Sequence, residues 1–166
     1  MLPDEVTQAT RSLLSLIEQL AAGAGSLKSL QEDVVAAISQ RLPYYDWIGF
    51  YMLDPNDAQT LVLGPFLGEP TPHVRIPVNQ GICGAAVASG TTIVVDDVNA
   101  DPRYLSCSIK TRSEIVVPIY ARGIIVGEID IDSHTPAAFT GVDRAFLEEV
   151  ACTVGRYLET RSGAGV

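Results

Sequence analysis

The sequence has few residues of the kinds that cross-link a chain or coordinate metals, with three cysteines and two histidines among 166 residues. An odd number of cysteines does not suit the disulfide frameworks of small secreted domains. The N-terminal stretch also lacks the basic region followed by an apolar region that a secretory signal requires. Its cysteines and histidines show none of the close spacings typical of zinc sites. We therefore expect a cytoplasmic protein with reduced thiols and with no bound metal or cofactor.

Positive charge is also scarce, and what there is lies scattered along the chain. Eleven basic residues stand against twenty acidic ones, for a net charge of -9. A surplus of negative charge without a basic stripe disfavours nucleic acids and anionic membrane surfaces as partners. No apolar run approaches the ~20 residues that a membrane-spanning helix needs. We expect neither nucleic acid nor membrane among the partners.

Apolar residues make up 47% of the chain and recur with clear periods. A helical period predicts helices where apolar positions return every three or four residues, and a period of two predicts strands. The expected helices span residues 3–22, 27–42, 81–88 and 141–160, and the expected strands span 47–53, 60–68, 74–78, 91–96, 114–121 and 124–132. In the last helix, Cys152 is predicted to face the core beside Val150 and Val154.

These elements predict an α+β domain built on a mainly antiparallel sheet of about six strands. The N- and C-terminal helices are expected on one face of the sheet, and loops with short helices on the other. One domain should span residues 1–161, with a helical segment at 3–42, a core at 44–139 and a C-terminal helix at 141–160. Residues 162–166 are expected to form a disordered tail.

Candidate site residues gather between Ser106 and Ser133. Cys107 lies in a polar loop, and Glu114 stands just ahead of an apolar strand. In the run Glu128-Ile129-Asp130-Ile131-Asp132, the three acidic side chains share one face of a strand because residues two apart project together. Carboxylates this close destabilise one another unless they bind a cation such as magnesium, share protons or remain in water. The sequence leaves these alternatives open.

A second candidate surface lies on the strand at 47–53. Trp47, Gly49 and Tyr51 share one face of this strand. Two amphipathic aromatic rings flanking a glycine can form a small slot with an open floor, or they can simply be two partly buried core residues. The pattern alone does not decide between these.

Several motifs, taken together, resemble one known family. From Trp47 to about Phe146, the chain resembles the GAF-domain free methionine-(R)-sulfoxide reductases in the order and spacing of its motifs. These motifs are DWIGFY, LVLGPF, VRIP with the following GICG, the polar loop that contains Cys107, SEIVVPI and GEIDIDS. The resemblance implies a GAF-like fold that reduces free L-methionine-(R)-sulfoxide to methionine. It implies that Cys107 is the catalytic thiol, cycling through a sulfenic acid and a disulfide. Thioredoxin or another thiol would be the electron donor, and we expect a homodimer.

The resemblance also implies roles for five further residues. Glu114, Asp130 and Asp132 would bind and polarise the substrate, while Trp47 and Tyr51 would enclose its methyl group. Chemistry supports an acidic pocket, because one protonated carboxyl can supply a proton to the departing oxygen. The ionised carboxylates would hold the ammonium group of a free amino acid.

The chain departs from the family pattern at one position. The family commonly has a resolving cysteine where this sequence has His73, ahead of the retained Cys83. Either Cys83 therefore forms a disulfide with Cys107, or an external thiol reduces Cys107 directly. Nearby carboxylates raise the pKa of a thiol, and Lys110 and Arg112 are the local cations that can offset this effect.

Two other functions remain as alternatives. A non-catalytic GAF domain would bind a small ligand as a sensor or regulatory module. A chromophore-bearing GAF domain often has histidine after its attachment cysteine, whereas Ser108 follows Cys107 here.

Overall fold

The computed structural model describes residues 1–106 and 108–163 of the chain. Helices and strands occur where the two periodicities predict them, with ends that shift by a few residues. The elements are α1 (Pro3–Gly23), α2 (Leu27–Arg41), β1 (Trp47–Asp54), β2 (Asp57–Leu67), β3 (Arg75–Pro77), α3 (Gly81–Ser89), β4 (Ile93–Val95), the 3-10 turn η1 (Val98–Ala100), β5 (Ser113–Ala121), β6 (Ile124–Ser133) and α4 (Gly141–Gly163).

The strands form one antiparallel sheet in the order β3-β2-β1-β6-β5-β4. The hairpins β1–β2 and β5–β6 meet where β1 pairs with β6, so the two strands with the candidate site residues are the central pair. The segment through α3 crosses from β3 at one edge of the sheet to β4 at the other. This architecture confirms the expected α+β fold.

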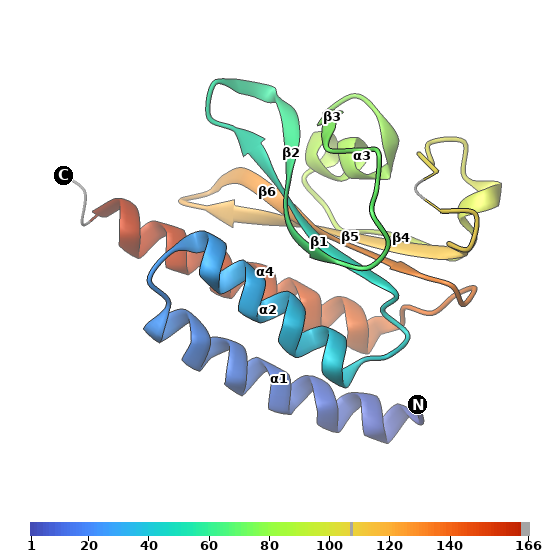
Figure 1. The fold of residues 1–166 in the computed structure, drawn as a ribbon, viewed down its shortest axis with the longest axis horizontal. Coiled ribbons are helices and arrows are strands. Elements are labelled where there is room, and N and C mark those ends of the chain that lie inside the picture. Colours follow the sequence, from blue (N-terminus) through green and yellow to red (C-terminus); the bar gives the residue numbers. More distant parts are fainter. Residues whose placement is uncertain (107, 164–166) are drawn as a thin grey trace.

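The helices form two layers on one side of the sheet (Figure 1). Helix α2 packs on β1 and β2, α4 packs on β5 and β6, and α1 lies outside them against α2 and α4. On the opposite face, α3 and the loops around it cover the sheet (Figure 1). Among the described residues, no helix combines the length and apolar composition that crossing a membrane would take.

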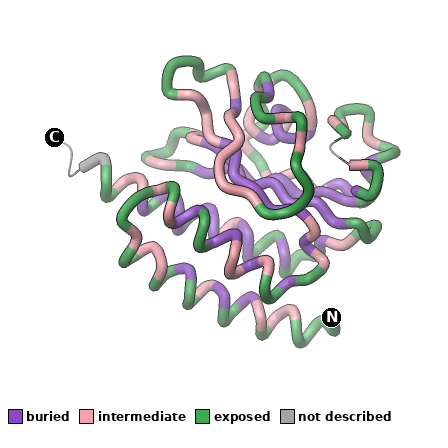
Figure 2. Tube along the Cα trace, viewed as in Figure 1, coloured by how far each residue is buried: buried purple, intermediate pink, exposed green. Residues whose placement is uncertain are grey.

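Two buried clusters lie on opposite faces of the sheet, and the strands β1, β5 and β6 are mostly buried (Figure 2). The alternation along β1 assigns its side chains to these clusters as the sequence predicts. Ile48 and Phe50 pack under the helices, whereas Trp47 and Tyr51 join the cluster on the α3 side. The α3 side of the central strands is therefore closed over by protein.

Helix α4 differs from the prediction in two respects. It continues to Gly163, and its last turns are held where Tyr157 donates a hydrogen bond to the carbonyl of Ala24 and Arg161 bonds the same segment. Residues 164–166 of the predicted tail lie outside the described residues. The prediction that Cys152 faces the core is wrong, because Cys152 is exposed. Residues at positions i and i+2 of a helix lie more than half a turn apart, so Cys152 points away from the buried Val150 and Val154.

Candidate functional site

The acidic run on β6 lies inside the protein. Glu128, Asp130 and Asp132 are 0%, 4% and 3% exposed, which excludes a solvated sheet face. They share the α3 side of the sheet, because the alternating Ile129 and Ile131 belong to the cluster under the helices. Both carboxyl oxygens of Glu128, and Oδ1 of Asp130 and of Asp132, have no hydrogen-bond partner among the described residues. Buried carboxyls without donors are expensive unless they hold a proton or meet a ligand.

Burial controls the protonation of these carboxyls. Burial is the main reason why the pKa of Asp130 is raised to about 6, and hydrogen bonds with Glu114 and Cys83 oppose this rise. Burial also raises the pKa of Glu128 and of Asp132 well above the usual range. The Cys83 thiol opposes the shift of Glu128, and repulsion from Asp130 adds to both shifts. Protons are therefore available inside the site near neutral pH, as general acid catalysis requires.

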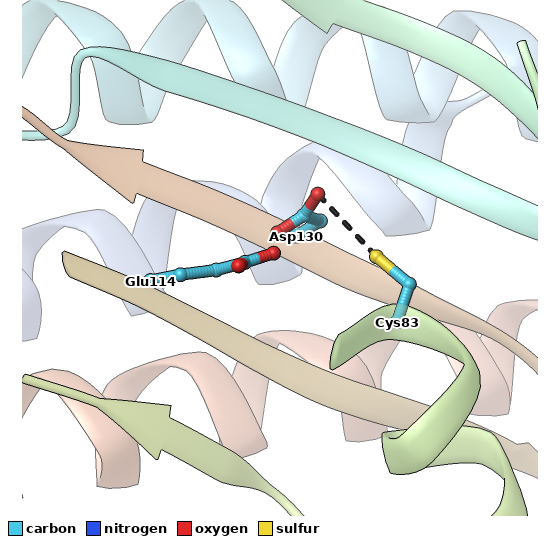
Figure 3. A group of neighbouring side chains, drawn as sticks. All are labelled: Cys83, Glu114 and Asp130. Carbon is cyan, nitrogen blue, oxygen red and sulfur yellow. Dashed lines mark hydrogen bonds between the residues drawn. The ribbon is translucent and has the colours of Figure 1, made fainter. Parts of the chain in front are cut away.

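Glu114 and Cys83 approach Asp130 from two other elements (Figure 3). Glu114 lies on β5 directly opposite Asp132 of β6. Cys83 lies on α3, and its Sγ donates a hydrogen bond to Oδ2 of Asp130 at 3.5 Å. Small residues such as Ala86 let α3 lie close to the sheet, where Cys83 is buried. Burial, followed by the charges of the surrounding carboxyls, raises the pKa of the Cys83 thiol.

Aromatic side chains lie beside the carboxyls because of the register between β1 and β6. Trp47 is opposite Asp132, and Tyr51 is opposite Glu128. The Trp47 and Tyr51 rings stack with centroids 6.2 Å apart. The sequence left open whether these rings form a slot or are core residues. The structure shows core residues, because both rings are buried and the Trp47 ring fills the space that a side chain at Gly49 would occupy. The indole itself covers this part of the strand, so the rings form a wall rather than a slot.

The aromatic wall is tied to the segment 69–73 between β2 and β3. The indole Nε1 of Trp47 donates to the carbonyl of Glu69 at 3.0 Å. The Tyr51 hydroxyl donates to the carbonyl of His73 at 2.8 Å. These bonds hold the segment next to the rings.

The same segment also contacts residues on either side of Cys107 in the sequence, and residues 105–106 and 108–110 are called the cysteine loop below. The ring Nε2 of His73 is 3.0 Å from the carbonyl oxygen of Ser106. The carboxylate of Glu69 accepts hydrogen bonds from Lys110 Nζ at 2.9 Å and from Ser108 Oγ at 3.2 Å. Residues 69 and 73 thus contact the chain both before and after position 107.

The structure brings together most, but not all, of the residues that the sequence singled out. Cys107, the expected catalytic thiol, lies outside the described residues. Lys110, one of the two expected cations, is engaged by Glu69, and Arg112 is exposed. Sequence reasoning gave no role to Glu69, because nothing in its local pattern marks it. Glu128 was visible in the alternating run, but its burial beside Cys83 was not.

Comparisons with known proteins identify the family and the fold. A family model described as GAF domain matches residues 5–158. The chain is 36% identical to the free methionine-R-sulfoxide reductase of Escherichia coli, over 85% of this chain and 83% of that protein. It is 43% identical to Protein YtsP of Bacillus subtilis, over 74% of each. It also superposes on the crystal structure of the free methionine-R-sulfoxide reductase of Neisseria meningitidis in complex with its substrate. That match has a TM-score of 0.87 and 35% identity, and covers 93% of this chain and 91% of that one.

Proposed function

The chain belongs to the GAF-domain family, and we propose that it reduces free methionine-(R)-sulfoxide to methionine. The observation that carries this proposal is the buried group of carboxyls that meets a thiol beside stacked aromatic rings. Such a site suits a small zwitterion with an apolar end. The relatives named as free methionine-R-sulfoxide reductases give independent support.

The substrate would be bound by two kinds of contact. The stacked Trp47 and Tyr51 rings would enclose the methyl group and exclude water from it. Ionised carboxylates among Glu114, Asp130 and Asp132 would hold the ammonium group through charge-assisted hydrogen bonds. A protonated member of the same group would donate a hydrogen bond to the sulfoxide oxygen, which becomes more basic as the S–O bond breaks.

Cys107 would be the nucleophile of the chemical step. Its thiolate attacks the sulfoxide sulfur, the bond between that sulfur and oxygen breaks, and the oxygen passes to the cysteine sulfur. A proton from a site carboxyl completes a sulfenic acid on Cys107 and leaves methionine as the thioether. The thiol is oxidised by two electrons and the sulfoxide is reduced by two electrons, so no further reactant is needed.

Recycling needs a thiol that attacks the sulfenic acid and releases water. Cys83 would form a disulfide with Cys107, which thioredoxin or another dithiol then reduces, or the external thiol would attack Cys107 directly. The burial that raises the pKa of Cys83 works against the first route, because the attacking species is the thiolate. We further propose that the protein acts as a homodimer.

A single-turnover assay tests the proposal. Reduced protein is mixed with free methionine-(R)-sulfoxide without a recycling reductant, and methionine formed and thiols lost are counted. We expect about one methionine per chain, selectivity for the R epimer, and none from Cys107→Ser. Loss of two thiols would identify Cys83 as the resolving residue, and loss of one would indicate a persistent sulfenic acid. A folded protein that forms no methionine would instead be a ligand-binding GAF domain.

A further inference from the structure

Three of the buried site residues converge as metal ligands do. The Sγ of Cys83 and one carboxylate oxygen each from Glu114 and Asp130 lie within 4.8 Å of one another. The three side chains are 5%, 6% and 4% exposed and come from α3, β5 and β6 (Figure 3). Since these elements are fixed by the sheet and by the packing of α3 upon it, the three side chains are held together by the fold.

A second observation points to a cation at the same place. Glu128 projects to the same face of β6 as Asp130, is 0% exposed, and has no hydrogen-bond partner for either oxygen among the described residues. It interacts electrostatically with Cys83, and Oδ1 of Asp130 is likewise unpaired. When such buried carboxyls lose their protons, the resulting carboxylates are stabilised by pairing or by coordinating a metal. Among the described residues, no lysine, arginine or histidine side chain is buried.

We propose that Cys83, Glu114 and Asp130 form a binding site for a divalent cation of the zinc class. Zinc accepts thiolate and carboxylate ligands in a tetrahedral arrangement, and three protein ligands leave a fourth position for water or for Glu128. When the metal binds, the S–H bond of Cys83 breaks, a sulfur–metal bond forms and the proton passes to buffer, so no oxidation state changes. Magnesium is a poor match, because it prefers an octahedral set of oxygen ligands and thiolates select softer metals.

This site does not follow from the spacing of cysteines and histidines in the sequence, because its ligands come from three separate elements. It also has a consequence that rests on the proposed function. A metal held by Glu114 and Asp130 would occupy carboxylates that the substrate needs. Zinc at concentrations near the metal-binding constant should therefore inhibit sulfoxide reduction, and a chelator should restore it.

Cobalt binding tests the site without any reference to catalysis. The reduced full-length protein is titrated with Co²⁺ under anaerobic conditions, and the near-ultraviolet charge-transfer absorption of a thiolate–cobalt bond is followed. We expect one cobalt per chain, displaced by Zn²⁺ but not by excess Mg²⁺. Cys83→Ser should abolish the absorption. Asp130→Asn and Glu114→Gln should each weaken binding by at least the ~10–100-fold that loss of an outer-shell partner costs.

The other two cysteines provide matched controls. Cys152→Ser, on the exposed face of α4, and Cys107→Ser should both keep the absorption and the stoichiometry. Survival of the absorption in Cys83→Ser would overturn the proposal, as would unchanged affinity in folded Asp130→Asn and Glu114→Gln. The absence of cobalt binding to the reduced wild type would overturn it as well. Because sulfoxide reduction is assayed separately, a protein that reduces sulfoxide without binding cobalt refutes only the metal site.

Discussion

The buried carboxyl of Asp130 should make the protein less stable as pH rises through neutrality. Its pKa is raised from the usual 3.8 to about 6 in the folded protein, mainly by burial. In the pH range between these values the folded state holds a proton that the unfolded state has released. Protonation therefore stabilises the folded state at low pH, and this stabilisation is lost as pH rises through the folded pKa.

The magnitude follows from the size of the shift. About two pKa units at 1.36 kcal/mol each correspond to about 3 kcal/mol in the full transition. The isoelectric point of the chain is about 4.5, so we restrict the comparison to about pH 5 to 8, where the chain keeps a net negative charge. Over this range Asp130 is already ionised in the unfolded chain. With a pKa near 6 in the folded protein, its protonation contributes about 1.4 kcal/mol to the free energy of unfolding at pH 5, and this contribution is lost by pH 8.

The assay is urea unfolding of wild type and Asp130→Asn at several pH values, with a chelator present to exclude metals. We expect the stability of the variant relative to wild type to rise by about 1.4 kcal/mol between about pH 5 and pH 8. Repulsion from Asp130 also raises the pKa of Asp132, so removing the charge adds a change of the same sign.

An exposed carboxylate provides the control for this experiment. Asp57, the first residue of β2, has a lowered pKa, mainly because its carboxylate accepts hydrogen bonds from the Thr60 hydroxyl and the Gln59 amide. It is therefore ionised in both states throughout this range, and Asp57→Asn should differ from wild type by a constant amount. Parallel pH profiles for wild type and Asp130→Asn would refute the reasoning, because they would mean that Asp130 is ionised in the folded protein at low pH.

Three further predictions concern the packing of α4, the cysteine loop and recycling. Gly155→Ala should destabilise the protein by about 1–3 kcal/mol in urea unfolding, because the new methyl group would collide with the backbone carbonyl of Tyr120. Glu69→Gln removes the acceptor charge that holds the cysteine loop, so the single-turnover rate should fall while the unfolding free energy changes by no more than about 0.5 kcal/mol. His73→Cys should accelerate thioredoxin-dependent turnover and form a disulfide with Cys107 after one turnover, detected by peptide mass spectrometry.

Each of these variants has a control or a contrary outcome. Gly141→Ala lies at the other end of α4, where an added methyl group meets no atom within 4 Å, and should leave packing intact. Glu32→Gln removes an exposed carboxylate paired with Lys28 on α2 and should leave turnover unchanged. Equal rates in Glu69→Gln and Glu32→Gln would show that the contacts with the cysteine loop do not position the reacting thiol. Absence of the disulfide in His73→Cys would show that position 73 does not correspond to the family's resolving cysteine.

Local periodicity was sufficient to predict much of this protein. The helices, the strands and the faces of β1 follow from the positions of apolar residues, because backbone geometry alone decides which side chains project together. For the same reason the sequence indicated that Glu128, Asp130 and Asp132 share a face. The α+β class followed from the order of the elements, and the motifs were sufficient to indicate the GAF family.

Only the tertiary structure decided what surrounds that shared face. Whether three carboxyls on a strand are solvated or buried depends on which segments cover them, and α3 is far from β6 in the sequence. The hydrogen bond between Cys83 and Asp130, and the contact of Glu69 with the cysteine loop, join residues with no common local pattern. Burial raises the pKa of a carboxyl only when distant parts of the chain exclude water from it, so the chemistry of this site is a property of the fold rather than of any single segment.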